Sequence, residues 1–182
     1  MSTKSMRWVI ATGLAAALVL AAAAVFAAVG LSGLIPASNG ISGWTALQAD
    51  RPAASASELY KIYDGGDGPW KQAGVTSAFQ RVYKNATTKH ILTLVIHRTG
   101  TSSQLAKALY AKKNPAYSGS SGYTALQVSQ QAALAKPSNG VIAHLWNKTC
   151  YCTITVNGTS AADVSAAKSF LKSVSAKIAK SG

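Results

Sequence analysis

The amino-acid sequence predicts an α+β domain, in which a mainly antiparallel sheet is packed by about three helices and preceded by an N-terminal signal or anchor helix. Apolar residues alternate in several short runs, they recur at helical spacing in others, and the alternating runs follow one another through short turns. Neighbouring strands with short connections form antiparallel sheets, and amphipathic helices bury their apolar side against such a sheet.

The first 35 residues have the layout of an export signal. Lys4 and Arg7 precede an uncharged, alanine-rich run from Trp8 to Ile35. As a helix this run would extend about 40 Å, which is longer than the ~30 Å hydrocarbon core of a membrane. Two interpretations stay open: cleavage after Ala24 or Ala27, or retention as a single-pass anchor with the basic residues in the cytoplasm. Both place the rest of the chain in the cell envelope, outside the cytoplasm.

After this signal or anchor (residues 1–35) we expect a linker at 36–54 and a single α+β domain over 55–182. The linker is predicted because the residues of 36–54 are mostly small and polar and include proline and glycine at intervals. The Ser-x-x-Glu spacing at 55–58 is typical of a capping box and predicts a short helix over about 56–64.

Two strands are predicted next, over about 75–83 and 90–99. In the second strand, alternate positions from 92 to 96 are leucine, leucine and isoleucine, and the positions between them, continuing to His97, form the other face. Because both faces are largely apolar, we expect this strand in the middle of the sheet.

A second helix is predicted over about 102–113. Its inward residues should be Leu105, Ala108 and Leu109, and Pro115 lies just beyond its end. A helix of this kind would cover one face of the sheet.

The remaining chain predicts a loop, further strands and a last helix. The loop is at 117–123, one or two strands lie within 123–135, and a hairpin joins 141–146 to 150–156. The last helix, over about 160–179, has apolar residues at helical spacing and lysines outside that stripe.

The segment "ELYKIYDGG" resembles the Leu-Tyr-x-x-Ile-Asp-Gly-Gly signature of a family of exported bacterial proteins classed as a domain of unknown function. The similarity continues through the strand at 91–98, through "ALYAKKNP" and through "GVIAHLW". Tyr63 and the following "DGPW" depart from the usual pattern. The resemblance implies an exported α+β domain with a PsbP-like sandwich, and it implies no known activity.

The stretch 64–67 is notable because it holds two of only five acidic residues. Two carboxylates are too few for calcium, which takes six to eight oxygens, and the glycines follow a helix instead of preceding one as a phosphate cradle does. The glycines are expected to end the helix, with an aspartate bonding the turn; a pair of acid–base carboxylates is the alternative. The candidate ligand-binding residues are Asp64, Gly65, Gly66, Asp67, His97 and Tyr123. No metal site, cofactor or catalytic residue is predicted.

Cys150 and Cys152 stand two residues apart in a predicted strand. Their Cα atoms would be roughly 6.5–7 Å apart, at the upper limit for a disulfide, although export favours one. Alternation places both sulfurs on the core face. A buried or bridged pair and a redox-active pair both stay open. His97 and His144 are expected to be structural residues on neighbouring strands.

The chain is basic, with 18 lysines and arginines against five acidic residues and a net charge of +13. The lysines are spread along the sequence, which favours solubility beside an anionic membrane over nucleic-acid binding. We expect an exported, membrane-tethered, non-enzymatic envelope domain that binds a partner or ligand on its sheet or beside the 117–123 loop. The alternatives are a polyanion-binding protein and a small extracytoplasmic thiol-redox or other enzyme that uses Cys150 and Cys152.

Overall fold

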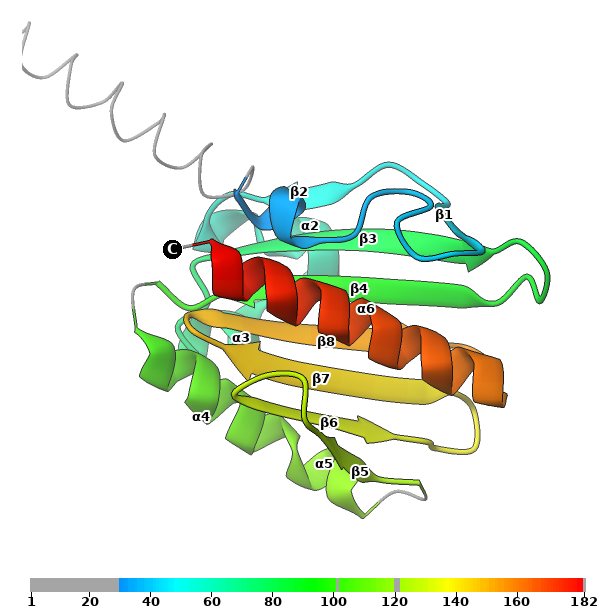
Figure 1. Ribbon diagram of the computed structural model, residues 1–182. Coiled ribbons are helices and arrows are strands. Elements are labelled where there is room, and N and C mark those ends of the chain that lie inside the picture. Colours follow the sequence, from blue (N-terminus) through cyan, green and yellow to red (C-terminus); the bar gives the residue numbers. More distant parts are fainter. Residues whose placement is uncertain (1–29, 101, 120–121, 182) are drawn as a thin grey trace, which may run out of the picture.

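The computed structural model describes residues 30–100, 102–119 and 122–181 (Figure 1). The strands are β1 (Trp44–Ala46), β2 (Arg51–Ala53), β3 (Ser77–Asn85), β4 (Ile91–Arg98), β5 (Thr124–Leu126), β6 (Gln131–Ala135), β7 (Val141–Asn147) and β8 (Cys150–Val156). The helices are α2 (Tyr60–Tyr63), α3 (Gly68–Gln72), α4 (Ser103–Lys113), α5 (Pro115–Ser118) and α6 (Ala161–Lys180), with a 3-10 turn η1 (Ala56–Glu58). The eight strands form one sheet in the order β1-β3-β4-β8-β7-β6-β5, with β2 also paired to β3, and all the pairs are antiparallel.

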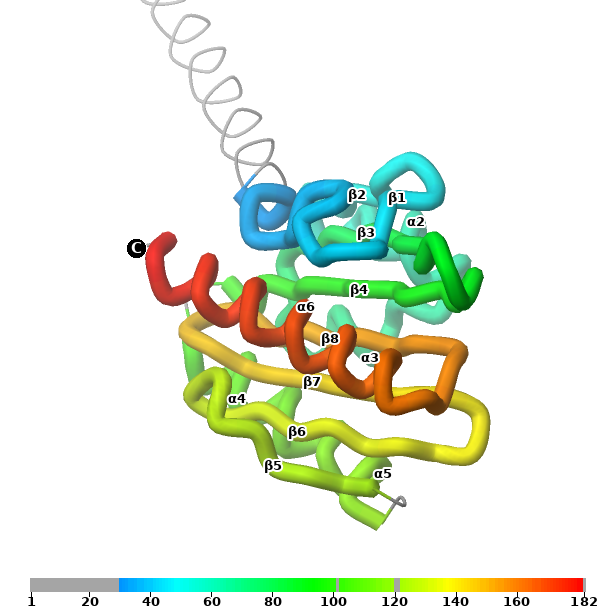
Figure 2. The backbone as a smooth tube through the Cα atoms, turned by 45° about the vertical axis from the view of Figure 1, so that its right-hand side comes forward, coloured from blue at the N-terminus to red at the C-terminus, as the bar shows by residue number. Residues whose placement is uncertain are grey.

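The sheet has a layer of helix on each face. Helix α6 crosses one face, and α2 to α5 lie on the other (Figures 1 and 2). In the central strand β4, Leu92, Leu94 and Ile96 enter the core under α6, whereas Val95 belongs to the core on the opposite side. The predicted α+β architecture, the antiparallel sheet and the two-faced burial of this strand are confirmed.

Helix α6 buries the stripe that its sequence predicts. Ala167, Leu171, Val174 and Ile178 are at most 1% exposed and pack on the sheet. The apolar stripe recurs at three- and four-residue spacing, so one side of the helix faces β7 and β8 along its whole length.

Helix α4 is rotated relative to our prediction. Leu109 is buried as expected, but Leu105 is 41% exposed and Ala108 is exposed, while Ala106 and Tyr110 are buried instead. The predictions for Leu105 and Ala108 are therefore wrong. Tyr110 shifts the buried stripe by one residue because its ring packs against the sheet face, a contact that helical spacing alone does not reveal.

Residues 36–54, which we expected to be a linker, belong to the domain. Strands β1 and β2 both lie in this segment and pair with successive parts of β3. Trp44 is 3% exposed and meets the Phe170 ring edge-on at 6.0 Å between centroids. The polar composition of the segment concealed this because short edge strands are held by main-chain hydrogen bonds, whatever their side chains.

The domain also includes the end of the apolar run. Residues 30–34 are helical, and Leu31, Leu34 and Ile35 are at most 5% exposed within the α6-side core. The rest of the predicted signal or anchor, residues 1–29, lies outside the described residues. Within the described part of the chain, no helix is both long enough and apolar enough to cross a membrane.

Candidate functional site

The Asp64–Asp67 turn ends one short helix and begins another. Asp64 caps α2 in the left-handed conformation (φ 47°, ψ 45°), and its N–H donates to the carbonyl of Tyr60. Gly65 follows at φ 91°, which a residue without Cβ adopts at no steric cost. Asp64, Gly65 and Gly66 are exposed, whereas Asp67 pairs with Lys71 one turn into α3. The two carboxylates therefore occupy different surroundings.

The turn has a consequence that its sequence did not suggest: it brings two aromatic rings together. Tyr63 precedes the turn and Trp70 follows it on α3, and their rings stack at 4.9 Å between centroids. Trp70 also stacks on the imidazole of His97, at 4.4 Å with an interplanar angle of 7°. The Asp-Gly-Gly stretch thus contributes to this stack indirectly: it sets the position of α3 over the sheet, and α3 carries Trp70.

His97 on β4 is completely buried beneath this stack. Its Nδ1 donates to the carbonyl of Tyr151, 3.1 Å away, so its Nε2 accepts from the hydroxyl of Tyr63. Burial lowers the pKa of His97 to about 4, and the charge of Lys113 acts in the same direction. The ring is therefore held neutral, in one tautomer and one orientation.

His144 on β7 forms the second half of the cluster. Its Nδ1 accepts from the hydroxyl of Tyr151 at 3.3 Å, and its Nε2 donates to Oδ1 of Asn114 at 3.1 Å. The same amide oxygen accepts from the Tyr123 hydroxyl at 3.1 Å, and the Tyr110 ring stacks on the imidazole at 4.2 Å. Burial lowers the pKa of His144 to about 4 as well.

Together these residues form a polar aromatic cluster between the sheet and the α2–α5 layer. Its members are Tyr63, Trp70, His97, Tyr110, Asn114, Tyr123, His144 and Tyr151. We predicted that His97 and His144 lie on neighbouring strands. This is wrong, because β8 lies between β4 and β7. Tyr151 on β8 fills that gap and bonds both rings, through its carbonyl and its hydroxyl. The cluster fixes the helices to the sheet by hydrogen bonds made within the chain.

Of the predicted candidates, His97 and Tyr123 lie in this cluster and Asp64, Gly65 and Gly66 lie outside it, on the surface. Sequence reasoning missed Trp70, Asn114 and Tyr151. For Tyr151 a signal existed, since it alternates with the two cysteines and must face away from them. For Trp70 and Asn114 the sequence offers only short, proline-containing segments without periodicity.

Cys150 and Cys152 are free thiols on the α6 side of β8. They are 3% and 0% exposed. Burial raises the pKa of both, against the lowering influence of Arg98 on Cys150. The thiolate is the reactive form of cysteine, and a raised pKa disfavours it. Both side chains therefore contribute to core packing as neutral thiols.

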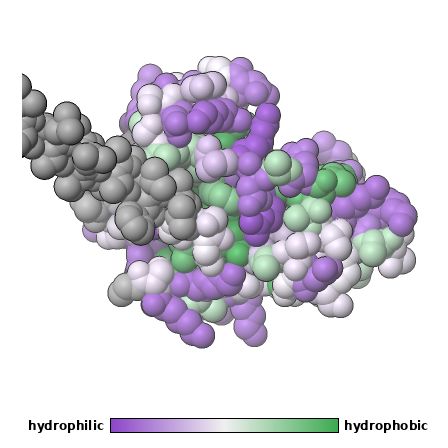
Figure 3. All heavy atoms as spheres, turned by 90° about the horizontal axis from the view of Figure 1, so that it is seen from above, coloured by the Kyte–Doolittle hydropathy of each residue, from purple (hydrophilic) through white to green (hydrophobic). Residues whose placement is uncertain are grey.

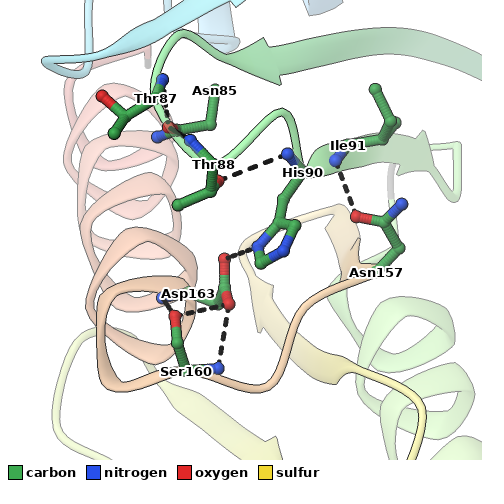
Figure 4. Close-up of polar contacts among 8 residues, drawn as sticks. All are labelled: Asn85, Thr87, Thr88, His90, Ile91, Asn157, Ser160 and Asp163. Carbon is green, nitrogen blue, oxygen red and sulfur yellow. Dashed lines mark hydrogen bonds and ion pairs between the residues drawn. The ribbon is translucent and has the colours of Figure 1, made fainter.

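A serine, a histidine and an aspartate also meet at the start of α6 (Figure 4). Asp163 Oδ1 accepts from Nδ1 of His90 at 2.8 Å, and its Oδ2 accepts from the Ser160 hydroxyl at 2.6 Å and from the Ser160 N–H at 2.9 Å. Burial raises the pKa of Asp163, but the bonds from Ser160 and His90 outweigh it and the net pKa is lowered. The serine donates to the carboxylate and not to the imidazole, so the trio lacks the nucleophile–base contact of a hydrolase.

The sheet face that carries the cluster also holds an open groove of about 460 Å³. Ile91, Thr93 and Ile142 form its half-buried floor, Thr155 is exposed in it, and Pro137 lies at its border. Thr155 is the direct cross-strand neighbour of both Thr93 and Ile142, which makes the floor continuous over three strands.

Comparison with protein-family models, with curated proteins and with solved structures found no significant match for this chain. Within the described residues, no group of three or more histidine, cysteine, aspartate or glutamate side chains could hold a metal ion.

Proposed function

We propose that this chain is an exported, membrane-tethered envelope domain that binds a partner or ligand on its sheet and catalyses no reaction. The observation that carries the proposal is the groove over β4, β8 and β7, which leaves apolar and threonine side chains accessible on three strands. The histidines of the same face, by contrast, are buried and hydrogen-bonded within the chain. Accessible surface is thus available for binding, while the groups suited to acid–base chemistry are engaged in packing.

Tethering is supported by the sequence order and by the position of residues 30–35. Lys4 and Arg7 precede the apolar run, as the positive-inside rule requires of an anchor with an exported C-terminal part. The last apolar residues of that run are in the domain core, so the domain follows the run directly. The similarity of "ELYKIYDGG" to exported bacterial proteins of PsbP-like fold agrees with this placement.

A photo-crosslinking residue at Thr155 tests the binding function in producing cells. We expect an adduct of one defined mass, because Thr155 is exposed in the groove. The matched control is the same replacement at Thr45, which is exposed on the edge strand β1. No adduct at Thr155, or the same adducts at both positions, would contradict the proposal.

Tethering is tested separately by fractionation. The full chain should stay with membranes after a carbonate wash and should be cleaved by protease added outside the cytoplasmic membrane. Recovery of the chain in the cytoplasmic fraction would refute the placement.

The second candidate function is thiol-redox chemistry, favoured by two free thiols two residues apart. Thiol titration of the native protein and of the protein unfolded in guanidinium distinguishes the two functions. We expect reaction with a thiol reagent only after unfolding, because both sulfurs are buried. Rapid reaction in the native state, or a reducible bond between Cys150 and Cys152, would favour the redox function instead.

A further inference from the structure

Basic side chains gather where the described chain begins. The C-terminal end of α6 lies beside residues 30–35 in both backbone views (Figures 1 and 2). Four cations lie beside residues 30–35 or at the adjoining end of α6, and we call them the basic collar: Arg98, Lys148, Lys177 and Lys180.

The contacts of the collar tie it to the chain entry. Lys177 Nζ donates to the carbonyl of Ile35 at 2.7 Å. Lys177 and Lys180 line a shallow groove of about 340 Å³ together with Gly30, Gly33, Leu34 and Ser181. Hydrophilic residues are spread over the coloured surface in the space-filling view (Figure 3).

The other two cations contact the start of the described chain and the end of α6, respectively. The Arg98 guanidinium lies 3.7 Å from the position that a Cβ of Gly30 would occupy. Lys148 Nζ donates to the carbonyl of Ala179 at 3.0 Å, which holds it at the end of α6.

Four of the five acidic side chains bond to residues outside the collar. Asp50, Glu58 and Asp67 form ion pairs with Arg81, Lys61 and Lys71, and Asp163 accepts a hydrogen bond from His90. The fifth, Asp64, caps α2. The collar therefore brings basic side chains together at the place where the predicted anchor joins the domain.

We propose that the basic collar binds the phosphate groups of anionic phospholipids and holds the end of α6 against the membrane surface. The inference rests on the proposed tether. The apolar run from Trp8 to residue 29 is long enough for the ~30 Å hydrocarbon core at ~1.5 Å per residue. Because no linker follows, Gly30 and the collar around it come within a Debye length, about 8 Å, of the headgroups.

The test uses the full chain in lipid nanodiscs, with a fluorophore on Ser181→Cys and a nitroxide on the lipid headgroups. Labelling is done on the native protein, in which Cys150 and Cys152 are buried, and the unsubstituted chain gives the background. We expect strong quenching in discs that contain phosphatidylglycerol and little in discs of phosphatidylcholine alone. The difference should vanish in high salt, which screens exposed charges. A label on Ala162→Cys, roughly 29 Å away along α6 at ~1.5 Å per residue, should be quenched weakly in both.

Substitution distinguishes the collar from the general charge of the protein. Lys177→Gln combined with Lys180→Gln should lower the ratio of docked to undocked domain roughly 30-fold, since each basic residue near an anionic surface strengthens attachment about fivefold; glutamine at 177 can still donate to the carbonyl of Ile35. The matched control is Lys168→Gln with Lys172→Gln, which removes the same charge from the exposed side of the same helix and should change little.

Equal quenching in the two lipids, or an equal loss of quenching in the two double variants, would contradict lipid binding by the collar. Failure of the chain to stay in the discs would instead refute the tether. In that case lipid binding by the collar is tested without the tether, by adding anionic vesicles to the labelled chain in solution. Quenching at position 181 would support binding by the collar, and no quenching would reject it.

Discussion

Burial determines how His97 and His144 contribute to stability. Each imidazole is neutral, and each has both nitrogens bonded to groups of the same chain. An imidazole in this state stabilises the fold only while its partners remain, because a buried acceptor without a donor costs more than the bond itself contributes. The hydroxyl of Tyr63 is such a donor.

Tyr63→Phe should lower the free energy of unfolding by about 1–3 kcal/mol, because it leaves Nε2 of His97 buried without a donor. Urea denaturation at neutral pH measures the change. Tyr60→Phe is the matched control, since Tyr60 is 54% exposed and its loss of a hydroxyl should change stability by less than about 0.5 kcal/mol. Equal effects at the two positions would contradict the role given to Tyr63.

The same burial predicts sensitivity to acid. Burial lowers the folded-state pKa of both His97 and His144 to about 4, from about 6.5 in the unfolded chain. Between these values the unfolded chain binds protons that the folded chain does not, so the free energy of unfolding falls as the pH falls. We expect a loss of about 2 kcal/mol per histidine between pH 7 and pH 5.

Urea denaturation over this pH range, on the natural chain and on His144→Gln, checks the prediction. The variant should lose about half as much stability as the natural chain, and the difference between the two isolates His144. Asp163 acts in a lower pH range: its folded-state pKa is lowered, so its contribution is complete above the unfolded value of about 3.9 and is lost as the pH falls from there through the lower folded-state pKa. Stability that is flat from pH 7 to pH 5 would show that the imidazoles are not held neutral by burial.

At the scale of elements, α6 depends on its first turn. Ser160 accepts from the N–H of Asp163 and the Asp163 carboxylate bonds back to the N–H of Ser160, which satisfies two free donors at the helix start. The same carboxylate anchors His90, so the cap also attaches α6 to the β3–β4 turn (Figure 4). A methyl group at Gly158 would overlap both side chains, which explains the glycine there.

Ser160→Ala should cost about 1 kcal/mol in free energy of unfolding, the usual effect of removing an N-cap. Ser165→Ala makes the same change at an exposed site of α6 and should be neutral or slightly stabilising, since alanine is the better helix former. Thermal denaturation of the two variants side by side measures both effects. A cost at Ser165 as large as at Ser160 would argue against the cap.

Elements with a long periodic pattern could be predicted from the sequence, and short ones could not. The alternation in β4 and the stripe of α6 both identify the buried face, because each repeats over enough residues to exclude other arrangements. Helix α3 has five residues and β1 and β2 have three each, which is too few for a period to appear. The capping box predicted at 55–58 is wrong: Ser55 makes no side-chain cap, and Glu58 accepts from the N–H of Ala54 instead of that of Ser55.

At the scale of the whole molecule, the domain begins earlier than its sequence suggests. Leu31 is completely buried, and truncating a buried leucine typically costs 2–5 kcal/mol, so we expect roughly that loss from Leu31→Ala. Leu47→Ala is the matched control, because Leu47 is 46% exposed. If residues 30–35 served only as the end of an anchor, both variants would unfold at the same urea concentration.

The candidate site could be predicted only in part, for a related reason. His97 was recognisable as a polar residue in an apolar strand, and Tyr123 as the aromatic residue at the end of the Gly/Ser-rich 117–123 loop. Their connection runs through Tyr151 and Asn114, however, and depends on which strand lies between β4 and β7. Strand order is set by contacts between segments far apart in the sequence, which local patterns do not encode.

The two edges of the sheet bear on how the protein behaves at high concentration. One edge is formed by β1 and β2, which divide the flank of β3 between two strands of three residues each, and Pro52 interrupts the donors of the second. The other edge is β5, again of three residues. An incoming strand needs a longer continuous row of free amides and carbonyls as a template, so this protein is protected against edge-to-edge aggregation despite its wide sheet.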